Sequence, residues 1–154
     1  MSTSATPPDG ATVLVVDDDP DAREILTRSL ESAGYRTLEA GSGQQCLDIV
    51  RSQPVDVILL DVIMPSMDGL AVCEELKKID QAAAISVILV TGRDDVGTRA
   101  AGMRLGVSEY LTKPVNMREL HTRVRSQLHA REIRRQLDDT SRKLGTLTGG
   151  GAVD

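Results

Sequence analysis

Five side chains suited to metal or phosphate chemistry stand directly after short apolar runs of this sequence. Asp17 and Asp18 follow the first run, and Asp61, Thr91 and Lys113 each follow a later one. Taken singly, each has an ordinary explanation, such as a loop acid near a helix start or a surface lysine. If the runs are parallel strands, however, their carboxyl ends meet at one edge of a sheet, where ligands bind. The repetition at four strand ends favours a common site.

The residue types indicate what this site could do. Clustered carboxylates suit a hard dication, and Mg²⁺ is held by few carboxylates together with waters and phosphate oxygens. Such an ion would offset the repulsion within the adjacent acids Asp17 and Asp18. A carboxylate can also attack phosphorus to give an acyl phosphate, and phosphoryl transfer needs mainly positioning and charge neutralisation. Lys113 could supply positive charge, and Thr91 could hydrogen-bond a phosphoryl oxygen.

The apolar runs themselves have the composition of strands buried on both faces. Residues 12–16, 55–60 and 85–90 are rich in Val, Ile and Leu and lack strict alternation, as expected in a parallel sheet. Residues 35–40 and 107–112 are weaker strand candidates nearer the sheet edges.

Amphipathic helical patterns separate these strands. They occupy residues 20–34, 43–53, 69–79 and 96–106, and a longer helix starts near Val115 and runs to about Leu137. For the first helix, Asp19 is the expected N-cap, Pro20 the first helical residue and Gly34 the terminator. Strand and helix alternate five times. This predicts an α/β fold, a doubly wound (βα)5 with a five-stranded parallel sheet and an extended C-terminal helix.

Composition narrows the class of protein. The chain has 154 residues, enough for one compact domain with flanks. Its net charge of −5 is uneven, because residues 1–112 carry 9 bases against 18 acids, whereas residues 113–143 carry 9 bases against 4 acids. An acidic body with a basic C-terminal segment favours protein partners over nucleic acid. There is no Trp or Phe, which argues against stacking on bases.

Cysteine usage and terminal pattern bear on localisation. Cys46 and Cys73 match no metal or redox spacing, so buried, inert thiols in a reduced, cytoplasmic protein are expected. No apolar run approaches the roughly 18 residues of a membrane span. The first ten residues lack a signal pattern and are predicted to be a disordered lead-in.

The motifs "VLVVDDD", "DVILLDVIMPSMDG", "ILVTG" and "YLTKP", in this order, carry a specific resemblance. Over residues 11–131 the sequence resembles the response-regulator receiver domains of two-component signalling, which have a flavodoxin-like fold. The resemblance implies that Asp61 is the phosphoacceptor. It also implies that Mg²⁺ (or Mn²⁺) is bound by Asp17, Asp18, Asp61 and the backbone carbonyl of Ile63.

The resemblance assigns further roles. Thr91 and Lys113 contact the phosphoryl group, and Tyr110 turns inward together with Thr91 when that group arrives. The bond between Lys113 and Pro114 is expected to be cis. Ile63 cannot orient a water and Arg93 could partly cover the site, so autodephosphorylation is expected to be slow.

The function implied is that of a phosphoacceptor. The chain takes a phosphoryl group from a sensor histidine kinase or phosphotransfer protein and changes its affinity for a downstream protein target, without being a turnover enzyme. One alternative is an aspartate-nucleophile phosphohydrolase, although Asp21 stands where those enzymes have Thr or Val and no cap domain fits the length. Another is a receiver-like scaffold that is never phosphorylated, which the presence of Asp61, Thr91 and Lys113 argues against.

The C-terminal segment leaves alternatives open. Residues 132–154 are predicted to be a helix extension and flexible tail. Ala130, Ile133 and Leu137 form a heptad fragment that Thr140 interrupts, so this segment is either a fraying helix or a short dimerising or linker helix. A homodimer through the last strand-and-helix face or the tail is therefore one alternative. No helix-turn-helix follows, so direct DNA binding is not expected. The chain is either a stand-alone receiver or a fragment of a larger regulator or kinase.

Overall fold

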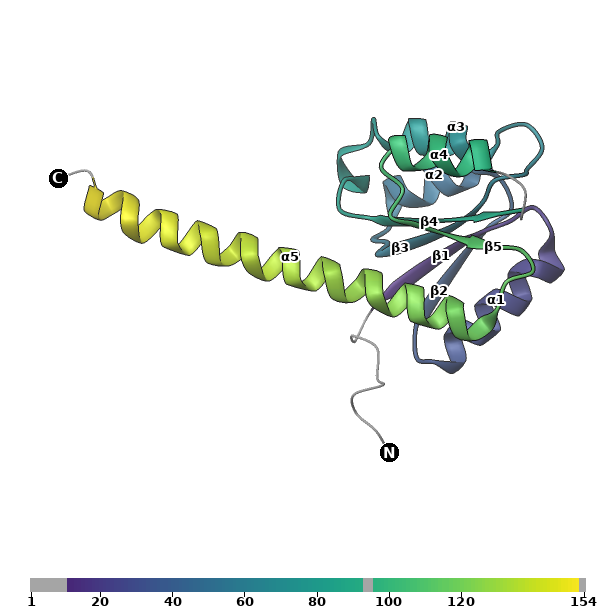
Figure 1. Ribbon diagram of the computed structural model, residues 1–154, viewed down its shortest axis with the longest axis horizontal. Helices are drawn as coiled ribbons and strands as arrows, with labels where there is room; N and C mark the ends of the chain where they lie inside the picture. Colours follow the sequence, from purple (N-terminus) through teal and green to yellow (C-terminus); the bar gives the residue numbers. More distant parts are fainter. Residues whose placement is uncertain (1–10, 93–95, 153–154) are drawn as a thin grey trace.

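The computed structural model describes residues 11–92 and 96–152, with side chains as far as residue 144. One parallel sheet lies between two layers of helices (Figure 1). Its strands are β1 Thr12–Val16, β2 Arg36–Ala40, β3 Val57–Asp61, β4 Ser86–Thr91 and β5 Glu109–Thr112. Their spatial order, β2-β1-β3-β4-β5, is that of flavodoxin-like doubly wound sheets. The predicted fold class and all the predicted strands are confirmed.

Helices cover both faces of the sheet. They are α1 Pro20–Ser32, α2 Gly43–Ser52, α3 Gly69–Leu76, α4 Val96–Arg104 and α5 Met117–Ala152, with a short 3₁₀ helix at Asp80–Ala82. α1 and α5 lie on one face, and α2, α3 and α4 lie on the other (Figure 1). Two apolar clusters result, because successive residues of a strand point to opposite faces. For example, Leu14 and Leu60 pack on the α2–α4 side, whereas Val15 and Leu59 pack on the α1–α5 side.

Both cysteines belong to the cluster under α2 and α3. Cys46 is fully buried and Cys73 nearly so, and burial raises the pKa of each thiol to about 12. A thiol is a poor nucleophile when it is protonated, which agrees with the interpretation of both as structural residues.

The start of α1 follows the expected capping pattern. The Asp19 side chain accepts a hydrogen bond from the backbone N–H of Asp21 at 3.0 Å, and Pro20 occupies the first helical position. Gly34, just past the end of the helix, has φ = 97°, which glycine adopts without steric cost. α1 therefore begins and ends where the sequence pattern predicts.

α5 is longer than the sequence pattern suggests. Its first part packs on the sheet through Leu120, Val124 and Leu128. Arg131 then links the helix to the domain, donating from Nη1 to Asp56 Oδ1 at 2.8 Å and from Nε to the Ala84 carbonyl at 2.6 Å. Beyond it the helix continues to Ala152, past the end expected near Leu137, and projects from the domain (Figure 1).

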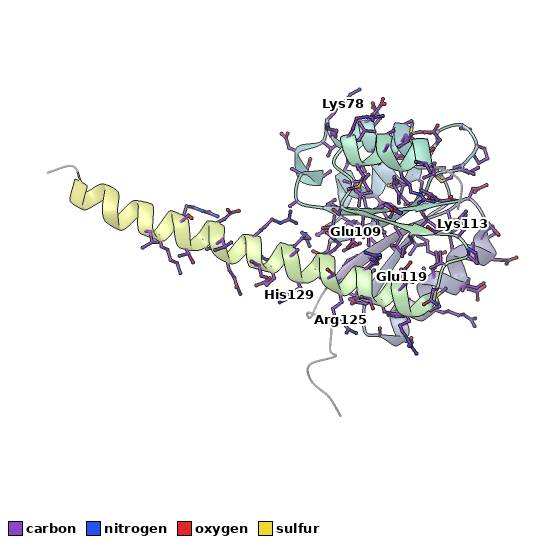
Figure 2. All side chains as sticks on the ribbon, in the orientation of Figure 1. Lys78, Glu109, Lys113, Glu119, Arg125 and His129 are labelled. Carbon is purple, nitrogen blue, oxygen red and sulfur yellow. The ribbon has the colours of Figure 1, made fainter. Side chains whose placement is uncertain are left out.

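Local ion pairs contribute to the stability of the projecting part. Figure 2 shows His129 near the place where α5 leaves the domain, with the following side chains spread around the helix. Ion pairs one turn apart, Glu132 with Arg135 and Asp139 with Arg142, support this helix weakly. The proposed division at residue 132 and the flexible tail stay predictions, and the predicted lead-in at residues 1–10 lies outside the described residues. Among the helices that are described, none is long and apolar enough to cross a membrane.

Candidate functional site

The structure brings the five residues singled out above to the carboxyl edge of the sheet. Asp17 and Asp18 follow β1, Asp61 and Thr91 are the last residues of β3 and β4, and Lys113 follows β5. β1 lies between β2 and β3, so the chain reverses its winding direction there. Such a switch point opens a crevice at the strand ends, where α/β sheets bind ligands.

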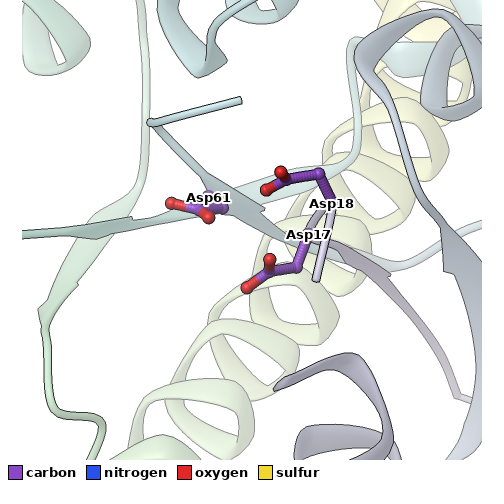
Figure 3. Close-up of side chains that lie close together, drawn as sticks. All are labelled: Asp17, Asp18 and Asp61. Carbon is purple, nitrogen blue, oxygen red and sulfur yellow. The ribbon is translucent and has the colours of Figure 1, made fainter. Parts of the chain in front are cut away.

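Three carboxylates form the centre of the site. Asp17, Asp18 and Asp61 each place a carboxylate oxygen within 4.8 Å of the other two (Figure 3). Asp17 and Asp61 are only 6% and 4% exposed, whereas Asp18 faces solvent. Burial raises the pKa of Asp17, and the negative charges of Asp61 and Asp18 raise it further, against the opposing effects of the Asp19 N–H and of Lys113. The protein therefore holds negative charge where solvation is poor.

Lys113 lies against this cluster. Lys113 Nζ is 3.1 Å from Asp61 Oδ1, and the same oxygen accepts a hydrogen bond from the Ile63 backbone N–H at 3.2 Å. A single ammonium offsets only part of the charge of three carboxylates. The remaining donor set is made of hard oxygens in a partly open site, and it fits a dication such as Mg²⁺.

Thr91 contributes an unsatisfied hydroxyl. Its Oγ1 is buried and has no hydrogen-bond partner within the described part of the chain. Buried polar atoms nearly always have a partner, and an unpaired one costs free energy. An additional oxygen ligand at the site could satisfy this hydroxyl.

The other predicted site residues lie at the margin. Tyr110 on β5 is 38% exposed, and the Ile63 side chain is 71% exposed. The bond between Lys113 and Pro114 is cis, as expected. Arg93 lies outside the described residues. The roles assigned to Ile63, Tyr110 and Arg93 stay predictions.

Arg23 supports the site, and sequence reasoning missed it. Its Nη1 donates to the Asp17 carbonyl at 2.7 Å, and its Nε donates to Glu39 Oε1 at 3.1 Å. The arginine thus ties the loop after β1 to the end of β2. Only the pairing of β1 with β2 brings Glu39 near Arg23, so no local pattern reveals this contact.

Gly69 shapes the loop that follows Asp61. A Cβ at Gly69 would lie 2.8 Å from Val62 Cα and 2.9 Å from the Asp61 carbonyl oxygen. The Gly69 N–H donates to the Val62 carbonyl at 2.9 Å, which closes the loop that follows Asp61. In the sequence, the Asp68-Gly69 pair at the start of α3 is the one feature that points to this close approach. A glycine at this position is also an ordinary turn residue, so the pair alone does not predict it.

Comparison with known proteins gives one consistent family. A family model described as "Response regulator receiver domain" matches residues 13–125. Response regulator MprA of Mycolicibacterium vanbaalenii is 41% identical over 116 residues, which cover 75% of this chain and 49% of that protein. The chain spans about half the length of the first relatives that it matches.

Solved structures agree. The receiver domain of Francisella response regulator 1452 superposes with a TM-score of 0.72 at 30% identity, over 79% of this chain and 98% of that one. The signal receiver domain of a signal transduction histidine kinase from Syntrophus aciditrophicus gives a TM-score of 0.73 at 31% identity, over 79% and 92% of the two chains.

Replacement of Gly69 by alanine tests the loop geometry. We expect Gly69→Ala to lower the free energy of unfolding by about 1–3 kcal/mol, because the methyl group overlaps backbone atoms that cannot yield cheaply. Gly97→Ala in α4 is the matched control, since a Cβ there meets nothing within 4 Å. The control should stabilise the protein by up to about 1 kcal/mol. Urea unfolding measures both, and equal effects would contradict the close approach at Gly69.

Proposed function

We infer the function from one premise, which is that this chain belongs to the response regulator receiver family of two-component systems. We propose that it accepts a phosphoryl group on Asp61 from a sensor histidine kinase or phosphotransfer protein. The observation that supports this most directly is the pairing of a buried Asp61 carboxylate with Lys113 at 3.1 Å, beside two further carboxylates.

We propose that Asp17, Asp18 and Asp61 hold a divalent cation, with the Ile63 carbonyl as a further ligand on the strength of the family resemblance. The chemistry that Mg²⁺ or Mn²⁺ supplies when bound is neutralisation of carboxylate and phosphoryl charge. The close approach of three carboxylate oxygens and the excess of negative charge over Lys113 support this assignment.

The residues of the chain have separate tasks in the transfer. An Asp61 carboxylate oxygen attacks phosphorus, an O–P bond forms, and the P–N bond to the donor imidazole breaks while that imidazole takes up a proton. Lys113 Nζ, already beside Oδ1, is placed to attract the phosphoryl oxygens. The Thr91 hydroxyl, which lacks a partner in the described chain, can donate to one of them. Positioning and charge neutralisation of this kind are the main needs of phosphoryl transfer.

Persistence of the product distinguishes a signalling protein from a phosphohydrolase. Asp61 is only 4% exposed, so water reaches its acyl phosphate poorly. The exposed Ile63 side chain has no group that could orient an attacking water. We therefore propose slow autodephosphorylation and no separate substrate.

Mass spectrometry of the intact protein tests phosphoryl transfer to Asp61 directly. After incubation with Mg²⁺ and a small phosphodonor, intact mass should increase by one phosphoryl group, and chelation of Mg²⁺ should prevent the increase. Asp61→Ala should abolish the adduct, whereas Asp21→Ala, which removes an exposed acid outside the cluster, should leave it.

The alternatives give different results in the same experiment. Consumption of the donor without a lasting adduct would favour a phosphohydrolase. Failure of every donor to react would favour a receiver-like scaffold.

We propose that the output of the switch is contact with a downstream protein target in the cytoplasm, without direct DNA binding. A second copy of this chain is one partner that the helix extension fits. Ile133, Leu137 and Leu144 of α5 are all exposed. They fall, with Ala130, on positions of a heptad repeat, and exposed apolar residues at this spacing favour a two-stranded coiled coil.

Sedimentation tests this dimer. The wild-type chain should show concentration-dependent dimerisation that Leu137→Ala weakens, because one apolar contact of the repeat is lost from each helix. Gln136→Ala, on the adjacent exposed position of α5, should sediment as wild type does. A wild-type chain that remains monomeric at high concentration, with or without phosphodonor, would contradict the proposal.

A further inference from the structure

Arg99 of α4 contacts both β5 and the residue that follows β4. Its guanidinium carbon lies 5.0 Å from the centroid of the Tyr110 ring on β5. Its Nη2 donates to the Gly92 carbonyl at 3.2 Å, and Gly92 directly follows Thr91 at the end of β4. One side chain thus joins α4, β5 and the backbone next to the Thr91 hydroxyl.

The strand register places Thr91 and Tyr110 on the same face of the sheet. Leu89 pairs with Tyr110, and Thr91 pairs with Thr112, two residues further along β5. Leu89 belongs to the cluster under α2–α4. Because side chains alternate along a strand, Thr91, Leu89 and Tyr110 all point toward α4. Tyr110 and Thr91 are therefore diagonal neighbours beneath the helix that carries Arg99.

Tyr110 and Thr91 differ in their exposure and in their contacts. Tyr110 is 38% exposed, and a cation over its ring favours this placement, since the ring face attracts a guanidinium. Thr91 is 1% exposed, and its hydroxyl has no partner in the part of the chain that is described. Tyr110 already has a favourable contact with Arg99, whereas the Thr91 hydroxyl can still gain a hydrogen bond.

We propose that Arg99 is a positioning residue that holds Tyr110 outward and, through the Gly92 carbonyl, holds Thr91 in its unphosphorylated position. This rests on the proposed function, in which Thr91 donates to a phosphoryl group on Asp61. Movement of Thr91 toward that group displaces Gly92 and strains the contacts of Arg99. Arg99 therefore favours the unphosphorylated state, and its removal shifts the equilibrium toward the phosphorylated conformation.

The composition of the chain provides a specific probe. Tyr35 and Tyr110 are the only tyrosines, and the chain contains no Trp. In a Tyr35→Phe background, tyrosine fluorescence therefore reports on Tyr110 alone, and acrylamide quenching measures its accessibility. We expect Arg99→Gln to reduce quenching in the absence of any phosphodonor, because Tyr110 turns inward.

Two further variants distinguish loss of the cation over the Tyr110 ring from a general disturbance of α4. Arg99→Lys keeps a cation near the ring and should restore most of the quenching. Arg104→Gln removes an exposed arginine of the same helix and should match the parent. Thermal melting of each variant establishes that it is folded.

Phosphorylation gives a second, separate readout. Arg99→Gln should take up the phosphoryl group from a small donor about two- to five-fold faster, the factor expected for loss of a cation–π contact at a partly exposed site. Unchanged or increased quenching in Arg99→Gln, or failure of Arg99→Lys to restore it, would overturn the role of Arg99. Reduced quenching with an unchanged rate would overturn its coupling to Thr91.

Failure of the role proposed for Arg99 can be distinguished from failure of the proposed phosphoacceptor function. If no variant forms an adduct on Asp61, the phosphoacceptor role fails. The quenching data, which need no phosphodonor, would still show whether Arg99 holds Tyr110 outward.

Discussion

The convergence of Asp17, Asp18 and Asp61 at one edge of the sheet is the constraint on which the rest of the structure depends. Parallel pairing of β1 with β3 forces these acids together, and like charges in a poorly solvated site repel strongly. The fold opposes this repulsion with contacts to the acidic residues themselves. The Asp19 N–H and the Ile63 N–H bind the Asp17 and Asp61 carboxylates, respectively, Arg23 binds the Asp17 carbonyl, and Lys113 pairs with Asp61.

The two apolar clusters hold the three acids in a rigid arrangement. β1 and β3 are buried along their whole length, so their ends cannot separate without disruption of the packing of both helix layers. Close-packed interiors transmit small displacements instead of absorbing them. A displacement at Asp61 is therefore expected to move its neighbours Thr91 and Lys113. Through them it is expected to move the α4–β5 surface.

Much of this could be predicted from the sequence because it depends on local pattern. Strand composition, the Asp19-Pro20 helix start and the position of polar residues after apolar runs were sufficient for the fold and for the gathering of residues at one edge. The close approach of Gly69 to Asp61 and the contacts of Arg23 and Arg99 depend on register and loop closure, which no local pattern encodes. The sequence pattern predicts too short an α5, because residues 138–144 are exposed and show no apolar face that would reveal the helix.

The most direct test of the account is the thermal stability of the chain in Mg²⁺. If the acidic cluster is a cation site, a ligand that binds only the folded state must raise the unfolding midpoint. The midpoint should rise with MgCl₂ but not with NaCl at the same ionic strength, and the difference should vanish in a variant that carries Asp17→Asn and Asp18→Asn. Equal midpoints in the two salts for the wild-type chain would contradict the account.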